Sequence, residues 1–97
     1  MDLFQKQDWK SASGLFEKAV HANPQYAQAY EAWGRAELYA ENLDHSLELS
    51  QKAIALNPSS YAPYEYLAAV YRVLNEPEKA EAVLAKFHNT SSTETRF

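Results

Sequence analysis

Residues 24–58 read PQYAQAYEAWGRAELYAENLDHSLELSQKAIALNP, and each of the two end prolines follows an asparagine. Pro24 and Pro58 are 34 positions apart, and the segments before them match at the same offset, with FEKAV at 16–20 aligned to SQKAI at 50–54. Self-similarity at a fixed period of this length is typical of stacked helical units. The stretch therefore predicts a repeat array, and an array of this kind usually serves as a binding scaffold.

Apolar residues recur at steps of three and four, which is the pattern of a helix with one buried stripe. This spacing predicts helices over 9–22, 26–39, 43–56, from the serines at 59–60 to about 74, and 76–88. The two Asn-Pro pairs are expected to end helices, because the residue before a proline is driven out of the α region. Asn42 is expected to cap the third helix. Short loops and the lack of an alternating strand pattern predict an all-α fold of about five antiparallel helices.

Small residues occupy equivalent places in the two complete repeat units. Gly34 and Ala68 are 34 apart, and each follows a larger residue, Trp33 or Leu67. We expect these small residues to let the second helix of each pair come close, with a matching small set at Ala12, Ser46 and Ala80. The inward stripe predicted for the first helix consists of Trp9, Ala12, Leu15, Phe16, Ala19 and Val20.

Composition excludes several classes of protein. The chain has 97 residues, enough for one domain, and a net charge of −4 without a clustered basic face, which argues against nucleic-acid binding. The sequence contains no apolar run of about 18 residues, so no membrane span is predicted. Cysteine is absent, so a disulfide framework is excluded; this leaves the compartment open, with a slight preference for the cytoplasm.

The sequence predicts no catalytic site, no cofactor and no metal. We expect the histidines His21, His45 and His88 to be ordinary surface or helix-end residues. Asp44, His45 and Ser46 are consecutive on a predicted helix, so their side chains diverge and cannot form a catalytic triad.

These residues resemble the tetratricopeptide repeat, whose pattern is W-x2-L-G-x2-Y, then A-x3-F, then P, on a period of 34. In the central unit the pattern falls on Tyr30, Trp33, Gly34, Glu37, Ser46, Ser50 and Pro58, and in the next on Tyr64, Leu67, Ala68, Tyr71, Ala80 and Leu84. Glu37, Ser46 and Ser50 depart from it, because they place polar groups where the family is apolar or small. The resemblance implies a right-handed α-solenoid of antiparallel helix pairs. Its units are a partial first repeat at 1–22, complete repeats at 23–57 and 58–90, and a frayed tail at 91–97.

The resemblance also implies a non-catalytic scaffold that binds a peptide or partner protein in a concave groove lined by the first helix of each pair. The groove positions chosen for this role are Gln28, Glu31, Arg35, Tyr39, Glu65, Tyr66, Ala69 and Arg72. The two arginines suit a carboxylate, and the two tyrosines offer amphipathic contact area. The alternative is that the charged members form an ordinary solvated helix face. One subtype of the family clamps acidic chaperone tails with basic residues; Glu31 and Glu65 would repel such a tail, so we expect this mode to be absent.

A second function remains open. The truncated first unit leaves the outer face of the 9–22 helix, with Trp9 and Phe16 on or near it, without its usual partner. This face predicts a structural or self-associating fragment that forms a homo-oligomer through the exposed N-terminal helix. The alternative is that the N-terminal segment folds back and covers the face.

Overall fold

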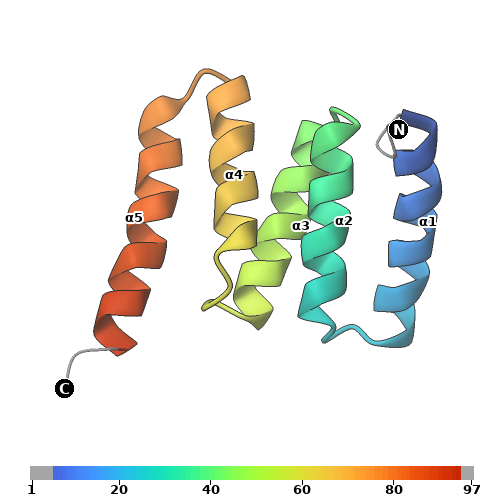
Figure 1. The fold of residues 1–97 in the computed structure, drawn as a ribbon, viewed down its shortest axis with the longest axis horizontal. Coiled ribbons are helices and arrows are strands. Elements are labelled where there is room, and N and C mark those ends of the chain that lie inside the picture. Colours follow the sequence, from blue (N-terminus) through green and yellow to red (C-terminus); the bar gives the residue numbers. More distant parts are fainter. Residues whose placement is uncertain (1–5, 95–97) are drawn as a thin grey trace.

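Five helices run alternately in opposite directions, and a short connection joins each helix to the next (Figure 1). The structure is a computed structural model that describes the backbone of residues 6–94 and the side chains of residues 10–88. The helices are α1 (Lys6–Ala22), α2 (Ala27–Tyr39), α3 (Leu43–Leu56), α4 (Ala62–Val73) and α5 (Pro77–Glu94). Residues 6–94 contain no strand. The prediction of an all-α chain with about five helices is confirmed.

Three helix boundaries differ from the predicted ones by two residues or more. Helix α4 begins at Ala62, after the predicted start at the serines at 59–60. Helix α1 begins at Lys6, before the predicted start at Trp9, whose side chain lies outside the described residues. Helix α5 continues to Glu94, beyond the predicted end at His88. No proline or glycine lies between His88 and Glu94 to stop the helix. Residues 91–94 of the predicted frayed tail are therefore helical, and 95–97 lie outside the described residues.

The Asn-Pro pairs end α1 and α3 in the same way. The Asn23 side-chain oxygen accepts a hydrogen bond from the Gln25 N–H at 3.1 Å, and that of Asn57 accepts from the Ser59 N–H at 3.4 Å. An asparagine that bonds the backbone two residues ahead forms a local turn that competes with helix continuation. The prediction that these pairs end two helices is confirmed.

The loops after α2 and α4 also match each other. Glu41 and Asn75 both have left-handed backbone conformations, with φ of 69° and 61°. The next N–H in each loop reaches back to a carbonyl in the last turn, from Asn42 to Glu37 at 2.9 Å and from Glu76 to Tyr71 at 2.7 Å. This geometry satisfies carbonyls that have no partner within the helix. Asn42 precedes α3 as predicted, but its side chain bonds the Glu37 carboxylate instead of the helix backbone, so the predicted side-chain cap is wrong.

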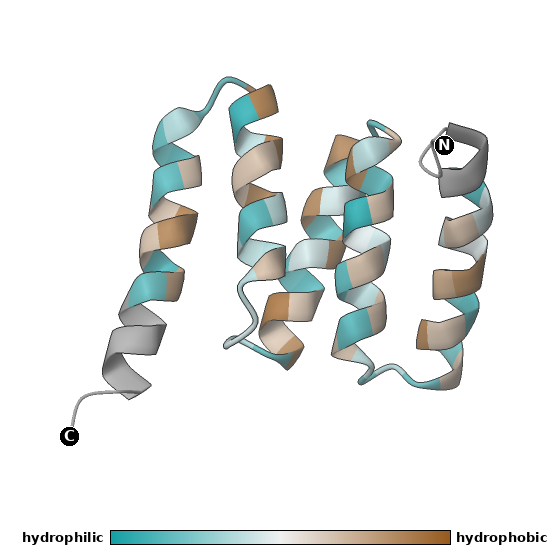
Figure 2. Cartoon of the chain, in the orientation of Figure 1, coloured by the Kyte–Doolittle hydropathy of each residue, from teal (hydrophilic) through white to brown (hydrophobic). Residues whose placement is uncertain are grey.

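Small residues bring α2 and α3 close together. The buried residues of these two helices include Ala29, Gly34, Ala36, Ser46, Ser50 and Ala53. The Ser46 hydroxyl donates to the Gly34 carbonyl at 2.8 Å, and a Cβ on Gly34 would lie 2.8 Å from the Ser50 Oγ. The expectation that a small residue at position 34 permits close approach is confirmed. Figure 2 shows hydrophobic and hydrophilic segments alternating along the helices, as expected for helices that bury one stripe.

Larger side chains fill the interface of α4 with α5. Tyr64, Leu67 and Val70 are buried, and the Phe87 ring lies 5.1 Å from the Tyr64 ring between centroids. The Tyr64 hydroxyl donates to the Pro58 carbonyl at 2.9 Å, which ties α4 to the preceding loop. This hydrogen bond and the Phe87 contact hold α4 between its two chain neighbours.

The predicted inward stripe of α1 is wrong at one position. Leu15 is 67% exposed, whereas Val20 on the same helix is buried. Among the described helices α1 packs against α2 alone, so only a narrow stripe of it is covered. On α3, by contrast, Leu49 is buried.

Two hollows on the surface repeat with the period of the sequence. One is bordered by α1, α2 and α3, and the other by α3, α4 and α5. Six lining positions of the first, namely Glu17, Val20, His21, Tyr30, Trp33 and Leu49, correspond at an offset of 34 to Gln51, Ile54, Ala55, Tyr64, Leu67 and Val83 of the second. Trp33 and Leu67 therefore have equivalent surroundings.

Candidate functional site

The predicted groove positions lie on α2 and α4. These two helices are in contact although α3 separates them along the chain. A hydrogen bond crosses between them near the start of α4, where the Ser60 hydroxyl donates to Glu31 at 2.9 Å. Residues from two repeat units are thus brought onto one surface.

Tyr66 lies at the centre of a polar cluster on this surface. Burial raises the pKa of the half-buried Tyr66 hydroxyl above its ordinary value. The Arg35 guanidinium opposes this change through its charge and a hydrogen bond, whereas Glu31 and Tyr39 add to it through their charges. Tyr66 of α4 therefore interacts with three residues of α2, with Arg35 through a hydrogen bond and with Glu31 and Tyr39 through charge, and all four are predicted groove positions.

The other four predicted groove residues are not part of this cluster. Gln28, Glu65 and Arg72 are exposed, and Ala69 is half-buried on α4. The exposed fraction of Tyr39 is 53%, so its ring offers area to a partner at the edge of the cluster. The surface combines carboxylate, guanidinium and phenol groups, which suits hydrogen bonding to a peptide. Its binding role stays a prediction.

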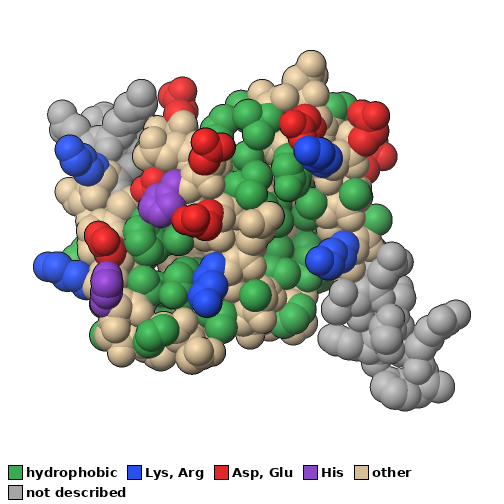
Figure 3. All heavy atoms as spheres, turned by 180° about the vertical axis from the view of Figure 1, so that it is seen from behind, with side chains coloured by type: hydrophobic (Ala, Val, Ile, Leu, Met, Phe, Trp, Pro, Cys, Tyr) green, Lys and Arg blue, Asp and Glu red, His purple; other side chains and the backbone are tan. Residues whose placement is uncertain are grey.

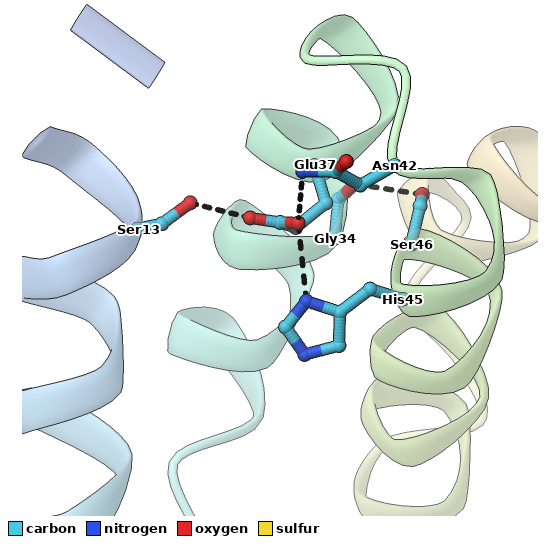
Figure 4. Close-up of polar contacts among 6 residues, drawn as sticks. All are labelled: Ser13, Gly34, Glu37, Asn42, His45 and Ser46. Atoms are coloured by element: carbon cyan, nitrogen blue, oxygen red, sulfur yellow. Dashed lines mark hydrogen bonds and ion pairs between the residues drawn. The ribbon is translucent and has the colours of Figure 1, made fainter. Parts of the chain in front are cut away.

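A second polar cluster was not predicted and is centred on Glu37 (Figure 4). Its carboxylate accepts hydrogen bonds from the Ser13 hydroxyl at 2.6 Å, the Asn42 amide at 2.9 Å and the His45 Nδ1 at 3.1 Å. The exposed fraction of Glu37 is 6%. The cluster joins α1, α2, the following loop and α3 around one buried charge.

Hydrogen bonds keep this buried carboxylate ionised. Burial by itself raises the pKa of Glu37. The hydrogen bonds from Ser13, His45 and Asn42, together with the His45 charge, lower the pKa by more than burial raises it, so the net pKa lies below its ordinary value of 4.5. Because a carboxylate can only accept, the His45 Nδ1 is the donor of its hydrogen bond to Glu37.

His45 is therefore more than the ordinary surface residue expected from the sequence. It is half-buried, and its ring meets the Trp33 ring edge-on at 5.1 Å between centroids. The one signal in the sequence was Glu37 itself, an acid where the repeat pattern has an aromatic residue. Its partners come from three other segments of the chain, so periodicity could not identify them.

Within the described residues, no group of three or more His, Cys, Asp or Glu side chains is placed to hold a metal ion. The helices in that part of the chain all lack the combination of length and apolar character that crossing a bilayer requires.

No model of a known protein family matches the chain. The chain is similar to "Protein SGT1 homolog" from Oryza sativa subsp. japonica, with 29% identity over 94 residues. The matched segment is 97% of this chain and 26% of the rice protein, so the chain spans about a quarter of that relative's length. The similarity thus covers all five helices rather than one motif.

Proposed function

We propose that the chain is a non-catalytic, right-handed α-solenoid of tetratricopeptide type that binds a peptide or partner protein on the α2–α4 face. The matching hollows support the repeat architecture, because six lining positions recur at an offset of 34. The similarity to Protein SGT1 homolog extends over 97% of the chain, which supports treating its helices as one unit.

The observation that carries the binding role is the contact of α2 with α4, where Ser60 donates to Glu31 at 2.9 Å and Arg35 hydrogen-bonds Tyr66. Side chains that belong to separate repeat units form one surface, as a ligand lying across both helices requires. Arg35 and Arg72 are both exposed and offer guanidinium groups to carboxylates or backbone carbonyls of a bound segment.

The test compares the intact protein with the Arg35→Glu, Arg72→Glu double variant in affinity capture from cell extract. Loss of a captured protein from the double variant is expected, since both changes reverse charge on the proposed groove. The matched control is Lys10→Glu, Lys18→Glu, which changes net charge by the same amount at two exposed positions of α1. Circular dichroism checks that all three proteins are folded.

Identical capture by all three proteins would rule out the groove as the binding surface. Equal losses from the groove variant and the α1 variant would show that only net charge matters, and would also count against the groove.

A second function, self-association, is favoured by Leu15. This residue is a large apolar side chain on α1 with an exposed fraction of 67%. We propose, as the alternative, that α1 of one chain packs on α1 of a second chain through this face.

A further inference from the structure

The hollow bordered by α1, α2 and α3 lies outside the proposed groove and has an apolar lining with charged residues around it. It encloses about 430 Å³, and Val20, Trp33 and Leu49 contribute apolar lining. Figure 3 shows apolar side chains lining a hollow on the face opposite to the view of Figure 1, with acidic and histidine side chains around it. None of the eight predicted groove residues lines this hollow. It is therefore a separate surface.

Carboxylates lie on both walls of this hollow. Glu17 lies on the α1 side and Glu48 on the α3 side, and both are exposed. A neighbouring hollow shares His45 with it and is lined by Glu37, Glu41, Asn42, Leu43 and Asp44. No lysine or arginine is among the residues that line either hollow. The two hollows thus share His45, and the charged residues that line them, apart from histidine, are all acidic.

One cationic side chain lies at an edge of the α1–α3 hollow. The Lys52 ammonium is 5.8 Å from the centre of the Tyr30 ring, and Tyr30 lines that hollow. This charge disfavours a second cation beside Tyr30, whereas the carboxylates around the α2–α3 loop favour one.

The hollow bordered by α3, α4 and α5 shows which features of the α1–α3 hollow come from the repeat and which are particular to the α1–α3 hollow. At the position of Glu17 it has Gln51, and at the position of Glu48 the chain has Ala82. Lys86 lines it, so its only charged lining residue is basic. Stacking of similar helices explains why both hollows exist, but it does not explain why one of them carries carboxylates on both walls.

We propose that the α1–α3 hollow docks a basic amphipathic segment of a partner protein. Apolar side chains of the segment pack against Trp33 and Leu49, and lysine or arginine side chains lie between Glu17 and Glu48. Charge complementarity selects this occupant, because an acidic segment would meet carboxylates on both walls. An apolar floor with charged walls is the usual arrangement for holding an amphipathic helix.

The test is an NMR titration with a synthetic peptide of leucine and lysine at helical spacing, and with a matched peptide that has glutamate in place of lysine. The lysine peptide is expected to shift the amide signals of α1 and α3 around Glu17 and Glu48, and the glutamate peptide is not.

The decisive variant is Glu17→Gln, Glu48→Ala, which installs the residues that the chain already has at the equivalent positions of the next unit. Because two solvent-facing ion pairs are lost, we expect affinity for the lysine peptide to fall by about two- to tenfold. The control variant Glu78→Gln, Glu81→Ala removes two exposed carboxylates of α5 that line none of the three hollows and is expected to bind as the intact protein does.

Three results would overturn the proposal. The first is equal weakening in the two variants, which would show attraction to net charge alone. The second is a set of shifted amides confined to α4 and α5 or to the α2–α4 face. The third is a concentration-dependent shift of the α1 and α3 amides without any peptide, which would show a second copy of the chain as the occupant.

Discussion

At the scale of single residues, the two glycines have opposite roles. A Cβ on Gly34 would lie 2.8 Å from the Ser50 Oγ and 3.4 Å from the Ser50 backbone nitrogen, whereas one on Gly14 would meet nothing within 4 Å. We expect Gly34→Ala to lower the free energy of unfolding by about 1–3 kcal/mol through overpacking. Gly14→Ala is expected to raise it by up to about 1 kcal/mol, since alanine favours the helix. Urea unfolding of both variants measures the difference.

A stabilising Gly34→Ala would contradict the close approach of α2 and α3. The two substitutions are matched controls, because each adds one methyl group to a helical glycine. Only the surroundings of the methyl group differ.

The two buried serines of α3 provide a second residue-level prediction. Ser46 and Ser50 are both 0% exposed, but only the Ser46 hydroxyl has a hydrogen-bond partner, the Gly34 carbonyl. Ser46→Ala is expected to cost about 0.5–1.5 kcal/mol, because the hydrogen bond is lost. Ser50→Ala removes a buried hydroxyl without a partner, so we expect no loss of stability or a small gain. Equal costs in thermal unfolding of the two variants would show that Ser50 makes an equivalent bond in solution.

Glu37 predicts a specific dependence of stability on pH. Its pKa is lowered in the folded chain, so its contribution to stability is present above its ordinary value of 4.5 and is lost as the pH falls through the folded pKa. We expect the free energy of unfolding of Glu37→Gln to change less with pH in this acidic range than that of the intact protein. Urea unfolding at a series of pH values from neutral to acid tests this, and two parallel profiles would contradict it.

At the scale of helices, α1 is an element with little tertiary support. It packs only on α2 among the described helices, whereas α2 packs on α1, α3 and α4. Val20 is the one buried residue among its described side chains, at 10–22. We expect α1 to open with a smaller free energy than α2, α3 and α4, so native-state hydrogen exchange of its amides should be faster. Equal protection of α1 and α2 would show that the two open as one unit.

The sequence did not predict the hydrogen bond that joins Ser13 of α1 to Glu37 of α2. Spacing correctly placed all five helices, and the two Asn-Pro pairs marked two of their ends. It could not show that Ser13 of α1 donates to Glu37 of α2, because 24 residues separate them and neither belongs to an apolar stripe. The burial of Leu15 was predicted wrongly for a related reason. Periodicity identifies the residues of an apolar stripe, but it does not show how much of that stripe a neighbouring helix covers.

At the scale of the whole molecule, the oligomeric state distinguishes the two proposed functions. We expect a single chain at micromolar concentration by size-exclusion chromatography with light scattering. Among the side chains of α1 that the structure describes, at 10–22, Leu15 is the one large apolar residue that is exposed, and a stable interface usually buries more than about 1,000 Å² in total. A dimer that Leu15→Lys dissociates would favour self-association instead, with Gly14→Ala as the control that leaves Leu15 in place.

The sequence by itself determined the helices, their order and the 34-residue repeat, because each depends on local spacing and on the backbone preferences of asparagine, proline and glycine. It also selected the α2–α4 positions, three of which interact with a fourth, Tyr66. Only the tertiary structure decided which polar residues share a surface. The Glu37 cluster and the acidic hollow both draw side chains from α1, α2 and α3, and such a meeting depends on how far the helices approach and rotate against one another. A periodic pattern along the chain does not contain that information.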